Sequence, residues 1–129
     1  MSIVVEGVIE LPFLDLTDTE GIREVLTLLQ DQGLLDLSEW HVEVGNGYIK
    51  LTHKERAWSW IEIREGKVRL DEHYKETVKF KDHLLSVLRE YYPMFRKALD
   101  IIHKNQITNY TLRFDKEKEK LILEVEDDA

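Results

Sequence analysis

The stretch Trp40–His53, WHVEVGNGYIKLTH, decides the fold because the chain can reverse at one identifiable point within it. Asn46-Gly47 lies between two runs of alternating apolar and polar residues. Both residues accept the positive φ angles of a type I′ turn, so the sequence predicts a two-residue β-hairpin. Apolar side chains then meet on one face and opposite charges on the other. The opposite pairs are Val44 with Ile49, Glu43 with Lys50, and Val42 with Leu51.

A second stretch, Ala57–Leu70 (AWSWIEIREGKVRL), has the same pattern around Glu65-Gly66. Glycine accepts a positive φ in the turn, and the flanking residues again alternate. The sequence therefore predicts another hairpin, and three matching pairs support its register. These pairs are Ile63 with Val68, Glu62 with Arg69, and Ile61 with Leu70.

The segments before the first hairpin predict one strand and one helix. Residues 3–11 alternate apolar side chains with acidic ones, which indicates a half-buried strand. Apolar residues within 18–31 recur every three or four positions, which predicts an amphipathic helix. Thr17 and Glu20 have the spacing of a capping box at its start, and Gly33 supplies a left-handed stop.

The segments after the second hairpin predict a long helix and a third hairpin. Residues 81–104 keep one apolar stripe across Pro93, so we expect a helix that is kinked or broken there. Residues 110–125 alternate apolar side chains on both sides of a charged turn, which indicates two more strands. The acidic residues 126–129 are expected to fray.

Together these elements have the order β-α-ββββ-α-ββ and predict a single α+β domain over residues 1–129. The sheet is expected to be mainly antiparallel, because tight hairpins connect most of its strands.

The chain of 129 residues has a formal net charge of −8, and this charge is unevenly distributed. Residues 1–43 hold one basic and ten acidic side chains, whereas residues 44–104 hold thirteen basic and nine acidic ones. An acidic first third repels phosphate groups, so binding along duplex DNA is disfavoured. Residues 44–104 carry a net positive charge, so this repulsion does not apply to them.

The composition also bears on localisation. Without cysteine, the chain can neither form disulfides nor use a thiolate as a metal ligand or nucleophile. The start MSIVVEGVIE has no basic region ahead of its apolar residues, unlike a signal peptide. No apolar run reaches the length of a membrane span. We therefore expect a cytoplasmic protein with no membrane partner.

Two tryptophans one residue apart mark the candidate binding surface. In the register of the second hairpin, Trp58 and Trp60 share the polar face, away from the isoleucines. Rings among basic groups suit a protein hot spot or the stacking of unpaired bases. The alternative is that a helix or a second subunit covers the rings as ordinary core. If the two hairpins form one meander, the predicted partner-binding face consists of Tyr48, Lys50, Trp58, Trp60, Arg64 and Arg69.

The second helix carries more large apolar residues than one contact with a sheet requires. A second apolar stripe would absorb them, and two-fold dimers are the commonest oligomers. We therefore expect a homodimer, with a contact helix that includes Tyr91, Tyr92, Phe95 and Leu99.

The histidines give no sign of a metal site. His41, His53, His73, His83 and His103 are scattered without the spacing of metal ligands, so no metal is expected. His53 shares a face with apolar residues and is expected in the core. The chain has no nucleotide fingerprint and no nucleophile motif, so we assign neither a cofactor nor catalytic residues.

These observations favour an acidic, homodimeric and non-catalytic module for protein interaction or assembly. In element order and acidity the chain resembles, in outline, small secretion-chaperone domains, although it lacks their closing C-terminal helix. That resemblance implies a dimeric module that binds another protein. Two alternatives stay open. One is single-stranded nucleic-acid binding through the Trp/Tyr/Arg/Lys sheet face, and the other is a small enzyme built from dispersed histidines and carboxylates.

Overall fold

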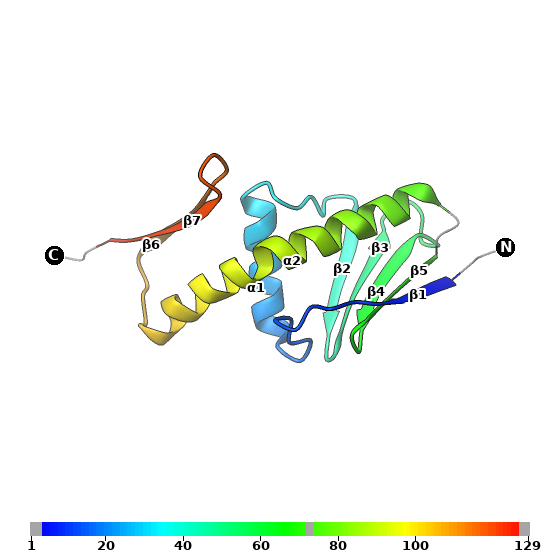
Figure 1. Cartoon of the computed structure of the whole chain (residues 1–129), viewed down its shortest axis with the longest axis horizontal. Helices are drawn as coiled ribbons and strands as arrows, with labels where there is room; N and C mark the ends of the chain where they lie inside the picture. Colours follow the sequence, from blue (N-terminus) through cyan, green and yellow to red (C-terminus); the bar gives the residue numbers. More distant parts are fainter. Residues whose placement is uncertain (1–3, 72–73, 127–129) are drawn as a thin grey trace.

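A computed structural model describes residues 4–71 and 74–126 and contains two helices and seven strands over these ranges (Figure 1). The predicted order β-α-ββββ-α-ββ and the α+β class are confirmed. Residue 3 of the predicted first strand, His73, and residues 127–129 of the predicted tail lie outside the described residues. The elements are β1 (Val4–Val8), α1 (Thr19–Asp31), β2 (Trp40–Gly45), β3 (Tyr48–His53), β4 (Trp60–Arg64), β5 (Lys67–Asp71), α2 (Lys75–Lys104), β6 (Tyr110–Asp115) and β7 (Lys120–Val125).

Five strands form one antiparallel sheet in the order β1-β5-β4-β3-β2, and β6 and β7 form a separate two-stranded sheet. Both predicted hairpin registers are confirmed, and β3 pairs with β4, so the two hairpins form one meander. Gly47 and Gly66 adopt positive φ angles of 93° and 71° at the two tips. Glu65 also adopts a positive φ, of 52°, which is uncommon for a residue with a side chain. The second turn therefore keeps the register although its first position is less favourable than asparagine.

The first half of α2 covers one face of the five-stranded sheet (Figure 1). The sheet contributes alternate buried residues such as Leu51 and Ile61, and the helix contributes Leu84 and Leu88. Alternation places the polar residues of the same strands on the opposite face. One face of the sheet thus belongs to the core, and the other carries the polar side chains.

The structure corrects the predicted start and continuity of the second helix. It begins at Lys75 instead of residue 81, and it runs as one helix through Pro93, so the predicted break is wrong. The kink stays a prediction. The polar first turns are held by tertiary contacts: the buried Thr77 hydroxyl bonds to Ser59, and Phe80 stacks on Trp40 with ring centroids 4.7 Å apart.

The second half of α2 packs within the same chain, which corrects the assignment of its aromatic residues to a dimer contact. Phe95 and Leu99 are buried, Tyr92 stacks on Phe13 at 5.8 Å, and Tyr91 meets Phe114 of β6 edge to face at 5.2 Å. The surplus apolar residues are therefore absorbed by α1, the segment before it and the β6–β7 hairpin. Homodimerisation itself stays a prediction, without this contact as its basis.

Helix α1 is capped by Asp18, not by the predicted pair of Thr17 and Glu20. The Asp18 carboxylate accepts a hydrogen bond from the Gly21 N–H at 3.2 Å. The Thr17 hydroxyl instead donates to Asp15 at 2.6 Å, and this bond lowers the pKa of Asp15. A positive φ of 71° at Gly33 confirms the predicted stop.

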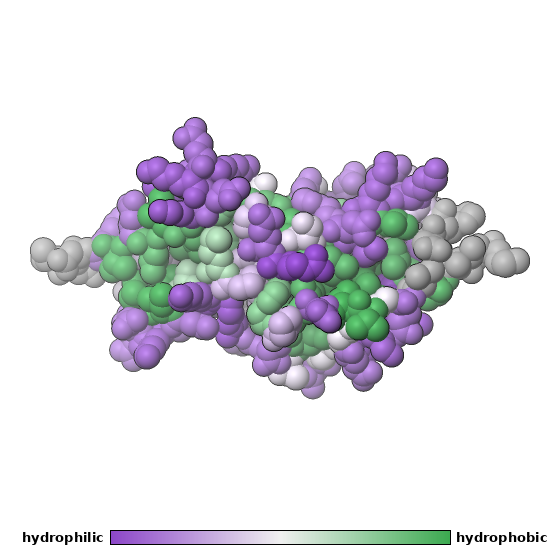
Figure 2. All heavy atoms as spheres, viewed as in Figure 1, coloured by the Kyte–Doolittle hydropathy of each residue, from purple (hydrophilic) through white to green (hydrophobic). Residues whose placement is uncertain are grey.

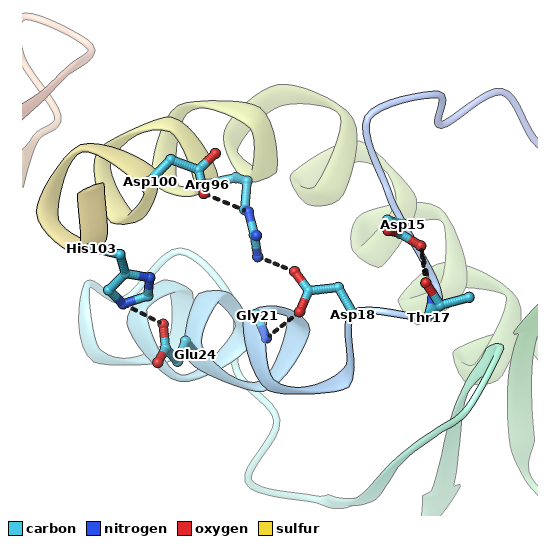
Figure 3. A network of polar contacts seen from close by, with 8 residues as sticks. All are labelled: Asp15, Thr17, Asp18, Gly21, Glu24, Arg96, Asp100 and His103. Carbon is cyan, nitrogen blue, oxygen red and sulfur yellow. Dashed lines mark hydrogen bonds and ion pairs between the residues drawn. The ribbon is translucent and has the colours of Figure 1, made fainter.

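The Asp18 cap also joins the two helices (Figure 3). Arg96 of α2 forms an ion pair with Asp18, and its Nε lies 3.2 Å from Asp100 on its own helix. About two turns after Arg96 on α2, His103 Nε2 lies 3.5 Å from a Glu24 oxygen. The N-terminal half of α1 is therefore tied to the C-terminal half of α2 by charged groups as well as by apolar packing.

Two side chains, one in α1 and one just after it, bond to the edges of the two sheets. The Arg23 guanidinium donates to the Val44 carbonyl of β2 at 2.8 Å. Gln32, which follows α1, donates to the Leu112 carbonyl at 3.3 Å and accepts from the Phe114 N–H at 2.9 Å. Both bonds of Gln32 are made to β6. Helix α1 thus occupies the space between the sheets and satisfies backbone groups that a neighbouring strand would otherwise have to pair.

We expect Gly21→Ala to destabilise the protein, although alanine is the better helix former by about 1 kcal/mol. A Cβ at this position would overlap the Arg96 guanidinium and the Asp18 carboxylate. The expected loss in the free energy of unfolding is about 1–2 kcal/mol by chemical denaturation. In an Arg96→Ala background the same change should cost clearly less. An equal cost in both backgrounds would contradict the steric role of the glycine.

Tyr92 should make stability depend on alkaline pH, because burial raises its pKa from the ordinary 10.0 to about 12. The folded state then keeps the phenol proton at pH values where the unfolded chain has lost it. The stability linked to this group is present below about pH 10 and is lost as the pH rises toward about 12. Denaturation midpoints across this range should fall less steeply for Tyr92→Phe than for the wild type; parallel curves would refute the assignment.

Candidate functional site

The candidate site is the face of the five-stranded sheet that α2 leaves uncovered, here called the outer face. Along β3 and β4 its side chains are half-buried or exposed, while the residues between them are buried. The meander brings together five of the six residues that the sequence predicted for a partner-binding face. These five are Tyr48, Lys50, Trp60, Arg64 and Arg69.

The central row of the outer face is a ladder of alternating charges. Each member lies directly opposite the next on the neighbouring strand, across all five strands of the sheet. Opposite charges at such positions stabilise the pairing by about 0.2–1 kcal/mol each and help to fix the register. In spatial order the ladder is Glu43, Lys50, Glu62, Arg69 and Glu6.

Glu62 at the centre of the ladder binds two cations. Its Oε1 lies 3.5 Å from Arg64 Nε and 3.8 Å from Arg69 Nη1. At the edge, Lys67 Nζ lies 3.5 Å from Glu6. The basic groups of the outer face are therefore largely neutralised by neighbours, which leaves a polar surface with little excess positive charge.

The aromatic rings of the outer face lie beside cations. The Arg64 guanidinium lies 4.4 Å from the centre of the Tyr48 ring, and Lys50 Nζ lies 5.6 Å from that of Trp60. The Tyr48 ring covers Gly45 across the hairpin, in space that a Cβ would fill. A hydrogen bond with Glu43 raises the pKa of Tyr48. These contacts restrain both rings.

Trp58 lies outside β4, so no pairing of the sheet places it, and its membership of the partner-binding face stays a prediction. It lies in a turn, closed by a 2.8 Å bond from the Ser59 N–H to the Arg56 carbonyl, just before β4 begins. Its ring meets that of Tyr74 edge to face at 5.5 Å, and the Arg56 guanidinium lies 4.6 Å from the Tyr74 ring. Trp58 is 48% exposed, so this cluster presents an aromatic surface next to the start of α2.

His53 is a core residue, as predicted. It is 4% exposed and meets the Trp40 ring edge to face at 5.2 Å. Its Nδ1 accepts from the Glu55 N–H at 3.1 Å, and its Nε2 lies 2.9 Å from Arg56 Nη2. His53 therefore connects the end of β3 to the turn that carries Trp58. The sequence did not indicate that His53 would support the turn next to the aromatic cluster.

The enzyme alternative stays a prediction, because one hollow of the surface is lined by His83 and Glu90 among other residues. Within residues 4–71 and 74–126, no three histidine, aspartate or glutamate side chains converge on a point that could hold a metal ion. A hollow of about 480 Å³ lies between the segment after β1 and the tip of the second hairpin, and Glu10 is the one ionisable residue among those described around it. A lowered pKa at Asp36 arises from hydrogen bonds with Ser38 in a surface turn. The hydrogen bonds of this turn are enough to explain the lowered pKa of Asp36.

Neither helix in the described part of the chain is both long and apolar enough to span a membrane.

Fluorescence quenching should distinguish the three tryptophans. Trp58 is 48% exposed and Trp40 only 6%, so Trp58→Phe should remove the component that acrylamide quenches most strongly. Trp40→Phe is the matched control and should leave that component in place. If both variants lose the same fraction of quenchable emission, the Trp58 ring is covered in solution.

Comparison with known proteins yields no match to a family model, to a curated protein or to a solved structure, so the outline resemblance to secretion-chaperone domains gains no support from it.

Proposed function

We propose that the protein is a non-catalytic interaction module that binds a partner protein through the outer face of its five-stranded sheet. The observation that carries this proposal is the pair of half-buried rings on the outer face, Tyr48 and Trp60, each beside a cation. Tryptophan, tyrosine and arginine dominate the energetics of protein interfaces. Rings that are already ordered lose little conformational entropy on binding.

The charge ladder supports a protein partner over a phosphate backbone. A nucleic acid would have to compete with Glu62 for both arginines, and with Glu6 for Lys67. The net charge of −8 adds a long-range repulsion. A protein that presents its own alternating charges could instead match the ladder row by row.

Binding of single-stranded nucleic acid is the second candidate, supported by the cation beside each outer-face ring. The stacking of one base on Trp60 would be worth about 1–3 kcal/mol. Titration with oligonucleotides at low and high salt distinguishes this candidate. Tryptophan quenching that weakens with salt would favour it, and the absence of quenching at low salt would leave the protein partner as the better proposal.

The proposal includes a homodimer working in the cytoplasm. Two copies would present two outer faces, and a partner with two sites would then gain from multivalent binding.

Site-specific photocrosslinking tests the outer face. A photoreactive residue at position 60 should crosslink to a discrete protein in cell extract, because the outer face is expected to contact its partner there. The same residue at position 97, an exposed lysine of α2, is the matched control and should not give this product. In binding assays with the partner thus identified, Trp60→Ala should weaken affinity at least tenfold, which corresponds to about 1.4 kcal/mol. Equal crosslinking from both positions would rule out the outer face.

A further inference from the structure

The β6–β7 hairpin has one covered edge and one open edge. Gln32 bonds to the backbone of β6 on its outer side, at Leu112 and Phe114. Within the described ranges, no hydrogen bond reaches the outer edge of β7 from another element. This edge is therefore a row of backbone donors and acceptors available to another strand.

The register of the hairpin identifies the open groups. The Glu126 N–H donates to the Asn109 carbonyl at 3.0 Å, so Glu126 directs its backbone toward β6. Alternate residues of an antiparallel strand direct their backbone groups to opposite sides. The N–H and C=O groups of Leu121, Leu123 and Val125 consequently point outward along the open edge.

The apolar face of the hairpin is also incomplete near its open end. Phe114 packs on α2, but further from the turn Val125 is 55% exposed and Tyr110 39% exposed. Ile101, near the end of α2, is 43% exposed. Figure 2 shows apolar surface gathered at this end of the molecule, over the hairpin and the end of α2. Two strands alone make a marginal sheet, so additional strands would stabilise it.

We propose that β7 pairs with β7 of a second copy, antiparallel and about a two-fold axis at Leu123. This inference rests on the homodimer in the proposed function and names its surface. About that axis apolar side chains meet on the face that carries Leu121, Leu123 and Val125, and Lys120 meets an opposite charge, whereas Ile122 meets a glutamate. The opposite pairs are Leu123 with the partner's Leu123, Leu121 with the partner's Val125, Ile122 with the partner's Glu124, and Lys120 with the partner's Glu126.

This register pairs the outward backbone groups along the open edge of β7. The outward N–H and C=O groups of the three residues Leu121, Leu123 and Val125 meet those of the partner strand. The two hairpins become one four-stranded sheet, and Val125 is buried against Leu121 of the other copy. A register centred on Ile122 would pair Ile122 with itself and Lys120 with the partner's Glu124. It would also place Val125, the apolar side chain of β7 that is 55% exposed, opposite the partner's Glu119 and leave it unburied.

A second copy suits this edge better than the edge of β2. There the Val44 carbonyl is already bonded to Arg23 of α1. A two-fold contact through β7 also satisfies both copies with the same residues, so that the assembly closes as a dimer.

Analytical ultracentrifugation of the full chain with Val125→Pro tests the proposal. Proline removes the outward N–H and places its ring where the partner strand would lie, while the bonds between β6 and β7 are kept. The wild type should sediment at twice the chain mass of 15.3 kDa and the variant at the chain mass. Trp60→Ala is the control and should remain dimeric. Circular dichroism establishes that the variant is folded.

Charge exchange provides a second test that does not depend on proline. Lys120→Glu and Glu126→Lys, each alone, place like charges opposite one another and should raise the dimer dissociation constant about tenfold. The double variant should recover wild-type affinity, and a mixture of the two single variants should form a heterodimer. Lys118→Glu, in the turn of the hairpin, makes the same change in charge outside the contact and should have little effect.

Two results would overturn the proposal. A wild type that is monomeric at all attainable concentrations would remove the homodimer altogether, while partner binding through the outer face could still hold. A dimer that persists in Val125→Pro and is indifferent to the charge exchange would retain the homodimer but exclude β7 as its surface.

Discussion

The apolar surface of α2 is the constraint on which the rest of the structure depends. A single helix from Lys75 to Lys104 supplies the core of two different sheets, one along each half of its length. The first half is occupied by the five-stranded sheet and the second by α1 and the β6–β7 hairpin. Because the chain has no third helix within the described residues, the opposite face of the larger sheet has no cover. The outer face is thus a consequence of how the apolar surface of α2 is shared.

Side chains cover parts of some sheet edges and leave other edges open. Polar side chains in and just after α1, Arg23 and Gln32, satisfy backbone groups on β2 and β6. At these positions side chains perform the role that a further strand performs in larger sheets. The outer edge of β7 has no such cover within the described residues, and it is the edge proposed here for self-association. The two proposed surfaces lie on different sheets, so mutation should separate the proposed partner binding from the proposed self-association.

Local signals in the sequence predicted the element order and both hairpin registers, because a tight turn fixes which residues oppose each other. Where the outcome depended on packing between distant segments, prediction failed. Trp58 lies in a turn before β4, so strand alternation does not place its ring. Tyr92 and Phe95 looked like surplus for a second subunit, because nothing in the sequence indicated that Phe13 and Phe114 would cover them. The bonds of Gln32 join residues from opposite ends of the chain and could not have been inferred from either end alone.

The position of β1 matters for synthesis on the ribosome. This strand is made before the other described strands, yet its neighbour is β5, and Val5 pairs with Leu70. During translation β1 has no strand to pair with until both hairpins have been made, and its valines lack their neighbours in the sheet for that time. Glu6 places a charge in the middle of the strand and later contacts Lys67. A charge at this point discourages association between nascent chains and also forms an ion pair in the finished fold.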